Sequence, residues 1–353
     1  MSFILDGEIL FPYVAEKTTA NRPVLLYGMG NGAEKIMKKC QAYGIAVRDI
    51  FASDEFVRGQ SFLGYTVKSY GEIRQTYDQA IVLVAFGSAD PVVLGRIREL
   101  AEQFEVLIPD LALFGEDEDI LSYGSLIEEV FHLYEAESQA IFLNLINFKI
   151  TGRLCYLEAA TTPKAEAYSL LKLQANEVYV DAGAYDGDTI REFRGQLAAL
   201  GYTHRSIIAI EPDPKNYRKL ENFAQTEALP GLKLLNVALS DHEGFMHFDD
   251  KAGRSSALSQ SGRKLVMTNR LDDLVSEPIT LLKMDVEGAE KLALEGSRRI
   301  LQKDKPRLII SAYHRSGDIL ELAQQIKAIN PDYRLSLRHH PYVPAWDTNI
   351  YAW

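Results

Sequence analysis

Short apolar runs and amphipathic segments alternate along most of the chain. The runs at 24–27, 80–85 and 206–210 are rich in Val, Ile and Leu and are bounded by polar or glycine-bearing loops, as buried strands are. The segments between the runs place apolar residues at helical spacing. Because strands that alternate with helices form parallel sheets covered by helices, the pattern predicts an α/β protein.

Two series of such units divide the chain. The charged run at 115–119 marks the end of the first series, and helical spacing from 125 to 147 indicates a connector. We predict an N-terminal arm, a smaller Rossmann-like domain, a helical connector and a larger α/β domain, at residues 1–20, 21–115, 116–175 and 176–353.

The smaller domain opens with a G-x-G-x-x-A loop that runs from Gly28 to Ala33. Asp49 and Asp54 lie near the ~20-residue offset at which dinucleotide-binding domains place a ribose-binding acid. Two interpretations stay open. The loop binds NAD or a nucleotide sugar, or its glycines serve only helix–strand packing.

The larger domain opens with a strand that ends in Asp181, followed by a loop with Gly183 and Gly187. Ligands of open α/β sheets bind outside the carboxyl ends of strands, where the strand order reverses. The glycine spacing matches neither a P-loop nor a dinucleotide fingerprint. A strand-end acid fits a ligand with a cationic amine and no pyrophosphate, such as S-adenosylmethionine. The alternative is a turn that serves only packing.

Four segments of this domain, in the order VDAGAYDGDT, AIEPDP, VALSD and LLKMDVEGAE, resemble the FkbM family of S-adenosylmethionine-dependent methyltransferases. The resemblance covers about residues 150–353. It implies a class I methyltransferase fold with a Rossmann-like seven-stranded sheet, and methyl transfer to oxygen on sugars or natural products. The cofactor-binding residues that it implies are Asp181, Gly183, Ala184, Tyr185, Gly187, Thr189, Glu211, Pro212, Asp213, Ala238, Leu239 and Asp285.

Three segments of the smaller domain, YGMGNG, FASD and GYTV, resemble the N-terminal domain of bacterial sugar O-acyltransferases. This resemblance implies at most a surface for a nucleotide sugar or a partner.

A hydroxyl acceptor must lose its proton during methyl transfer, so a general base is expected near the methyl group. Asp285 and His314 are the candidates, because each follows a strand and a neutral histidine can serve near pH 7. Alternatively, Asp285 caps the following helix or orients the cofactor, and His314 is a loop histidine satisfied by its neighbours. Many family members have an acid two residues before this histidine, where this chain has Ala312.

No metal is predicted. Glu287 and Glu290 share a helical turn near Asp285, but Mg²⁺ would need several more oxygen ligands. Lys283 is expected to pair with an acid or to point to the sheet edge. A solvated face, rather than a basic lip for an anionic sugar, is expected for Arg315, Arg338, His339 and His340.

The composition excludes some classes of partner. The net charge of -11 argues against nucleic-acid binding. No apolar run reaches the ~18 residues of a spanning helix, no signal peptide is recognised, and two cysteines suit a reducing compartment. We therefore expect a cytoplasmic protein with a small-molecule substrate, no membrane partner, and the possibility of a homodimer.

The predicted function is S-adenosylmethionine-dependent O-methylation of a sugar, glycan intermediate or natural product. Two alternatives belong to other classes. The first is a non-catalytic module that keeps a cofactor-type fold and docks a partner. The second is an enzyme that binds a nucleotide sugar or NAD through the loop of the smaller domain.

Overall fold

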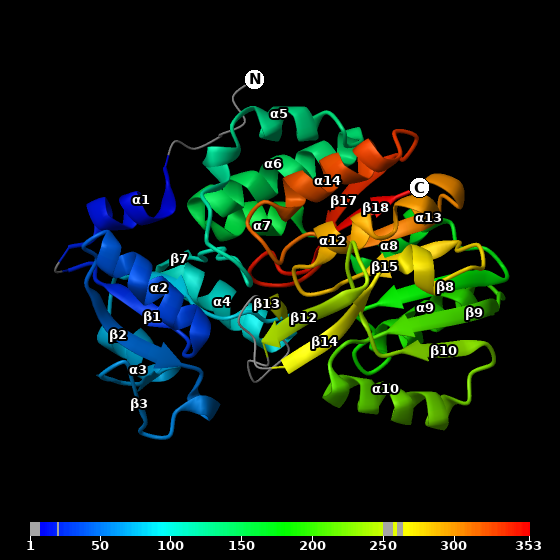
Figure 1. The fold of residues 1–353 in the computed structure, drawn as a ribbon. Helices are drawn as coiled ribbons and strands as arrows, with labels where there is room; N and C mark the ends of the chain where they lie inside the picture. The colour runs from blue at the N-terminus through cyan, green and yellow to red at the C-terminus, as the bar shows by residue number, and fades with distance from the viewer. Residues whose placement is uncertain (1–7, 20, 250–256, 260–263) are drawn as a thin grey trace.

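The computed structural model describes residues 8–19, 21–249, 257–259 and 264–353 (Figure 1). Its first sheet contains five parallel strands in the order β5-β2-β1-β6-β7. Strands β1 and β6 are buried along their whole length, as their apolar runs predict. The elements are β1 (Val24–Tyr27), α2 (Asn31–Ala42), β2 (Val47–Ala52), η1 (Asp54–Phe56), β3 (Ser61–Phe62), β4 (Tyr65–Thr66), β5 (Lys68–Ser69), α3 (Tyr70–Thr76), β6 (Ile81–Val84), α4 (Pro91–Gln103) and β7 (Glu105–Leu107).

A series of helices follows the first sheet and packs on the second one. The continuous helical stripe expected from 125 to 147 is divided into two helices, with a break at residues 132–135. Helix α6 ends at Gly152, whose left-handed conformation stops it, and the helix packs against strand β17. The helices are η2 (Ile120–Tyr123), α5 (Ser125–Phe131), α6 (Ala136–Thr151), α7 (Leu154–Ala160) and α8 (Lys164–Leu171). In the N-terminal arm, α1 (Leu10–Lys17) buries its apolar residues in the core of the first sheet.

The second sheet confirms the predicted seven-stranded α/β fold. Its order is β10-β9-β8-β15-β16-β18-β17, and β18 alone runs opposite to the other six strands. The strands are β8 (Glu177–Ala182), β9 (His204–Ile210), β10 (Leu232–Leu235), β15 (Leu281–Met284), β16 (Arg307–Ser311), β17 (Leu335–His339) and β18 (Thr348–Ala352). The helices are α9 (Asp188–Ala199), α10 (Pro214–Glu227), α11 (Leu271–Leu274), α12 (Glu290–Glu295), α13 (Arg298–Lys303) and α14 (Asp318–Ile329). Strand order reverses between β8 and β15.

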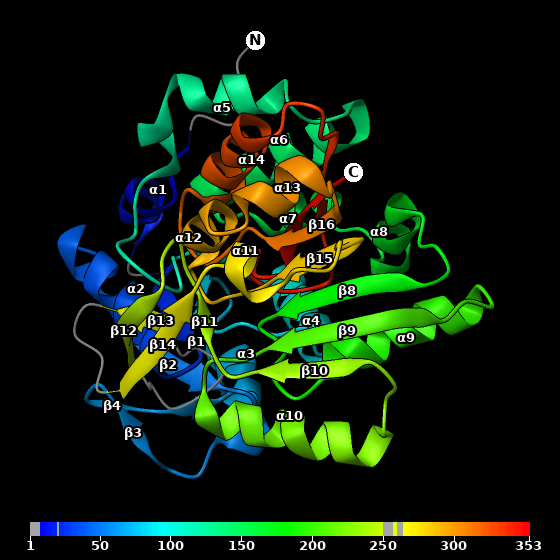
Figure 2. The same ribbon diagram turned by 45° about the vertical axis from the view of Figure 1, so that its right-hand side comes forward.

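A small four-stranded sheet, which the sequence pattern does not predict, branches from the second sheet. Its order is β11-β14-β12-β13, with β11 (Ala238–Leu239), β12 (Gly244–Asp249), β13 (Ala257–Ser259) and β14 (Lys264–Asn269). The carboxyl ends of β8, β9 and β10 face the part of the molecule that holds the first sheet (Figure 2).

One apolar cluster runs from the first sheet through the connector helices into the second sheet. It includes Tyr27 and Val82 of the first sheet, Phe142 of α6, and Val180 and Ile310 of the second sheet. The two sheets therefore share a core instead of meeting at a polar surface. None of the helices in the described ranges is both long enough and apolar enough to cross a lipid bilayer.

The expectation of a solvated basic face near the C-terminus is wrong for three of its four residues. Arg338, His339 and His340 are each at most 2% exposed. Burial lowers the pKa of His339 to about 3 and also lowers the pKa of His340, so both rings are neutral at neutral pH. These residues are buried because β17 pairs with β18 and is covered by α6. The local pattern of charges indicates neither contact.

Candidate active site

A cavity of about 320 Å³ lies at the carboxyl ends of the central strands, where the sheet order reverses. This is the position that open α/β sheets use for ligands. The predicted residues that line it are Gly183, Tyr185, Thr189, Glu211, Pro212, Asp213, Ala238, Leu239, Asp285 and His314. The other lining residues are Leu113, Asp188, Ile210, Asn216, Val237, Lys283, Val286, Glu287, Ala289, Tyr313, Tyr342 and Trp346.

Three predicted cofactor-binding residues lie behind the cavity wall. Asp181 is fully buried, and Ala184 packs its side chain into the core beneath α9. Gly187 lies against Phe223, where a Cβ atom would come within 2.6 Å of the ring. The local sequence places all three near the end of β8, but packing keeps them out of the cavity lining.

Gly183 brings the β8 loop against the β15 loop. Its φ is +84°, and a Cβ atom there would lie 1.8 Å from the carbonyl oxygen of Asp285. Only glycine fits both the conformation and the space. The carbonyl oxygen of Gly183 accepts a hydrogen bond from Lys283 Nζ at 2.9 Å, so the close approach also fixes a charged side chain.

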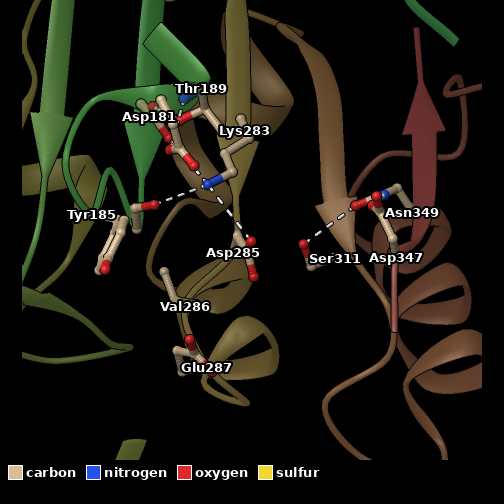
Figure 3. Close-up of polar contacts among 12 residues, drawn as sticks. Asp181, Tyr185, Thr189, Lys283, Asp285, Val286, Glu287, Ser311, Asp347 and Asn349 are labelled. Atoms are coloured by element: carbon tan, nitrogen blue, oxygen red, sulfur yellow. Dashed lines mark hydrogen bonds and ion pairs between the residues drawn. The ribbon is translucent and has the colours of Figure 1, made fainter. Parts of the chain in front are cut away.

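Lys283 lies between two acids, as Figure 3 shows. Its Nζ atom is 3.3 Å from Asp181 Oδ1 and 3.8 Å from Asp285 Oδ2, and Thr189 donates a hydrogen bond to the other oxygen of Asp181. Burial raises the pKa of Asp181, and Lys283 offsets this only in part. Burial opposes the charge of Asp285 as well, but Lys283 and His314 outweigh it and hold the Asp285 pKa below its usual value. The prediction that Lys283 pairs with an acid is confirmed.

Glu211 ends β9 and faces the cavity. Its two oxygens accept hydrogen bonds from Tyr185 N at 3.0 Å and from Asp213 N at 2.9 Å. Burial raises its pKa to about 7 despite these bonds. Asp213 caps α10 by accepting hydrogen bonds from Lys215 N and Asn216 N. Each Glu211 oxygen keeps a lone pair that a ligand hydroxyl group can use.

His314 is 1% exposed and lies among three carboxylates. Its Nδ1 atom is 3.0 Å from Glu290 Oε1, and its Nε2 atom is 3.4 Å from Asp285 Oδ1 and 3.5 Å from Glu287 Oε2. Burial favours the neutral ring, but the carboxylates outweigh it and raise the His314 pKa to about 10. The ring is therefore charged at neutral pH, and this differs from the neutral base that we expected.

Glu287 and Glu290 differ in their surroundings. Glu290 is buried and accepts a hydrogen bond from Val286 N at 2.8 Å, which makes it a local cap instead of a surface acid. Glu287 lines the cavity with φ at +56°, and burial raises its pKa to about 8. Ligand atoms of Asp285, Glu290 and His314 lie within 4.8 Å of one another, which is close enough for a cation. The two ring nitrogens of His314, however, face different carboxylates.

In the smaller domain, the geometry favours the packing interpretation of the glycine loop. Phe86 covers Gly28, and a Cβ atom at Gly32 would lie 2.4 Å from a carbonyl oxygen. Asp49 pairs with Lys68 at 2.8 Å and accepts a hydrogen bond from Tyr77. One acid expected to bind a ribose, Asp49, thus already has partners within its own domain.

Sequence reasoning missed several residues of the cavity wall. Tyr313 donates a hydrogen bond to Asp285 at 3.2 Å. Because it directly precedes the predicted His314, its position in the sequence could have indicated that it belongs to the site. Tyr342 and Trp346 lie on the loop between β17 and β18, far in sequence from the motifs. No local pattern indicates that this loop reaches the cavity.

The strand order, the single antiparallel strand and the cavity at the reversal point define a class I methyltransferase fold. Residues 181–335 match the family model described as the methyltransferase FkbM domain. This part of the chain is therefore similar to the FkbM methyltransferase domain, and its predicted resemblance is confirmed. The resemblance of the smaller domain to sugar O-acyltransferases stays a prediction.

Individual proteins support the same assignment. The chain is 27% identical over 224 residues to methyltransferase sdnD of Sordaria araneosa, which covers 52% of this chain and 82% of that protein. It is 31% identical over 163 residues to 2-O-methyltransferase NoeI of Sinorhizobium fredii (strain NBRC 101917 / NGR234). This match covers 39% of this chain and 63% of NoeI. The crystal structure of methyltransferase FkbM from Methylobacillus flagellatus KT matches 97% of this chain and 92% of its own, with a TM-score of 0.71 at 22% identity, and shows the same fold.

Proposed function

We propose that this protein is an S-adenosylmethionine-dependent O-methyltransferase that acts on a hydroxyl group of a sugar-type small molecule. One observation carries the proposal. One cavity is lined by Glu211 at the end of β9, by Asp285 at the end of β15 and by Gly183 after β8. Methyl transfer to oxygen is also the reaction in the name of the relative NoeI.

The residues present fit this cofactor. Glu211 would accept hydrogen bonds from the ribose hydroxyls, and Pro212, Ala238 and Leu239 would form apolar walls for the adenine. The glycine at 183 leaves space that a Cβ atom would fill, so backbone can approach the methionine part. When bound, S-adenosylmethionine supplies a methyl group already activated on a sulfonium.

The chain's own residues then have two tasks. The cavity would position the acceptor hydroxyl beside Asp285, and positioning accounts for much of the rate enhancement of a displacement of this kind. Asp285 is ionised and accepts the hydroxyl proton as the oxygen is methylated. His314, held between Asp285 and Glu290, keeps the carboxylate oriented.

Glu287 is a second base candidate. It lines the same cavity, and its raised pKa of about 8 lies closer to neutral pH than that of Asp285. Asp285 has the better position, because Tyr313, Lys283 and His314 fix it on three sides.

Calorimetric titration with S-adenosylmethionine and S-adenosylhomocysteine tests the proposal. We expect one site per chain, weakened at least about tenfold by Glu211→Gln, since two charge-assisted hydrogen bonds are lost. Glu221→Gln on the exposed face of α10 is the matched control and should leave affinity unchanged. If neither compound binds, the protein is not a methyltransferase of this kind, and the partner-docking alternative gains weight.

A further inference from the structure

The cavity lining includes three aromatic side chains that take no part in the proposed cofactor contacts. Tyr313 follows β16, and Tyr342 and Trp346 lie on the loop between β17 and β18. The hydrogen bond from Tyr313 to Asp285 places one of these rings beside the proposed base. The rings of Tyr342 and Trp346 lie 6.4 Å apart between centroids. These three rings therefore line the same cavity as Asp285.

The loop between β6 and α4 of the smaller domain holds the loop that carries Tyr342 and Trp346 in place. Ser88 and Val343 exchange two backbone hydrogen bonds, of 2.8 and 3.0 Å. Gly87 lies directly against the Trp346 ring, and a Cβ atom at Gly87 would come within 2.4 Å of it. The position of Trp346 thus depends on a residue of the smaller domain, about 260 residues away in the sequence.

The charge of the cavity limits what can bind. Five carboxylates line it, those of Asp188, Glu211, Asp213, Asp285 and Glu287. Among its lining residues, all of which belong to the described part of the chain, only Lys283 and His314 offer positive charge, and both already face carboxylates. A phosphate or a uronate would meet like charge there without a free cation. A neutral ring, whose C–H face carries partial positive charge, suits the negative faces of aromatic side chains.

We infer that Tyr313, Tyr342 and Trp346 form the acceptor subsite, that it takes an uncharged pyranose ring, and that Gly87 of the smaller domain sets its shape. The inference rests on the proposed function, because the subsite is useful only beside a bound cofactor. It selects against nucleotide-activated and acidic sugars. It also gives the smaller domain a role that needs no ligand of its own.

Tryptophan fluorescence tests the subsite directly. The chain has two tryptophans, so Trp353→Phe leaves Trp346 as the single reporter. With S-adenosylhomocysteine bound, we would titrate the p-nitrophenyl pyranosides of the common neutral hexoses, whose nitrophenyl group quenches a nearby indole. We expect saturable quenching by at least one pyranoside, reversed by the matching methyl pyranoside and absent with p-nitrophenyl glucuronide.

The outcomes separate the two proposals. Failure of S-adenosylhomocysteine to bind in calorimetry overturns the proposed function. Binding of S-adenosylhomocysteine without saturable quenching by any of these pyranosides overturns only the acceptor subsite. Equal quenching by p-nitrophenol, or by the glucuronide, shows an aromatic or an acidic acceptor and overturns the assignment of a neutral pyranose.

Gly87→Ala tests the role of the smaller domain. We expect the affinity for the pyranoside to fall at least about tenfold, because Trp346 must shift, while affinity for S-adenosylhomocysteine changes less than about twofold. Gly95→Ala on α4, where a Cβ atom meets nothing within 4 Å, is the control. Unchanged pyranoside affinity in folded Gly87→Ala overturns this role. If that variant does not fold, Trp346→Leu measured by calorimetry should show the same separation of the two affinities.

Discussion

The pKa values of the acids at the cavity depend on two opposing effects, burial and nearby positive charge. Asp181 and Asp285 share Lys283, yet the pKa of Asp181 is raised and that of Asp285 is lowered. The difference arises because Asp285 has His314 as a second positive neighbour, whereas Asp181 is fully enclosed. The charge of His314 is thus what distinguishes Asp285, the proposed base, from Asp181.

The proposed role of Glu211 predicts that cofactor affinity depends on pH. Its pKa of about 7 means that it gains a proton as the pH falls below that value, and a protonated carboxyl accepts ribose hydrogen bonds poorly. We expect the Kd for S-adenosylhomocysteine to rise below about pH 7, by up to about tenfold per pH unit, and to level off above about pH 8. Calorimetry at several pH values measures this.

Glu211→Gln is the control for that experiment. It should bind more weakly and lose most of the pH dependence, and any dependence that remains belongs to other groups. A wild-type affinity that is flat between about pH 5.5 and about pH 8 would contradict the proposed role of Glu211.

Replacement of Lys283 should destabilise the fold. Lys283→Met leaves Asp181 buried without its cation, and we expect a loss of about 3–5 kcal/mol in the free energy of unfolding. Urea denaturation measures it. Lys233→Met, which removes the exposed pair with Glu277, should change stability by less than about 1 kcal/mol. If Lys283→Met lowers the free energy of unfolding by as little as Lys233→Met does, Asp181 is protonated in the folded state.

The charged ring of His314 already supplies a positive group among Asp285, Glu287 and Glu290. We therefore expect that dialysis against EDTA leaves both the affinity for S-adenosylhomocysteine and the rate of methyl transfer unchanged. Restoration of a lost activity by added Mg²⁺ or Mn²⁺ would refute the prediction of no metal. It would point to Asp285, Glu290 and His314 as the ligands, because their ligand atoms lie within 4.8 Å of one another.

At the scale of elements, the site depends on a close approach between the ends of β8 and β15, which leaves no room for a side chain at Gly183. The loop after β8 passes under the loop after β15 at Gly183, and Lys283 of β15 reaches back to the Gly183 carbonyl oxygen. The strand–loop–helix pattern at 178–189 predicts this loop, but only the pairing of β8 with β15 shows what presses on it.

Gly183→Ala should therefore damage the fold itself. The added Cβ atom would overlap the Asp285 carbonyl, and φ is +84°, so we expect a loss of more than about 3 kcal/mol or failure to fold. Thermal unfolding followed by circular dichroism measures it. Gly195→Ala in α9, where nothing lies within 4 Å, should be neutral or stabilising by up to about 1 kcal/mol. Equal melting temperatures for the two variants would show that the loops can separate.

At the scale of the whole molecule, the connector joins the two sheets into one core. Arg338 of β17 is 2% exposed, and it donates hydrogen bonds to Ser138 of α6 at 2.7 Å and to Glu137 at 2.8 Å. Its stem fills space between the helix and the edge of the sheet, so packing and charge both tie the connector to the larger domain.

Two substitutions of Arg338 separate these contributions. Arg338→Ala leaves a cavity, and we expect it to cost about 3 kcal/mol of unfolding free energy. Arg338→Met keeps most of the volume, and Ser138 and Ser336 still bond each other, so we expect a cost below about 1.5 kcal/mol. Urea denaturation of both variants tests this. Equal costs would show that the charge, and not the packing, holds α6 on β17.

The sequence by itself determined the α/β class, the strand-end positions of Asp181, Glu211 and Asp285, and the resemblance to FkbM methyltransferases. These features are local, because strands, loops and the acids that end them lie within short segments whose apolar pattern reports burial. The buried state of Arg338 and His339, the branch sheet and the break in the helical stripe escaped the same reasoning.

Only the tertiary structure decided which residues meet at the cavity. The charge of His314 depends on three carboxylates that packing gathers around one ring, and the wall at Trp346 depends on Gly87 of another domain. Each of these contacts is set by how distant segments pack. Residues far apart in the sequence leave no periodic signal of their meeting, so the acceptor side of the site is a property of the folded molecule.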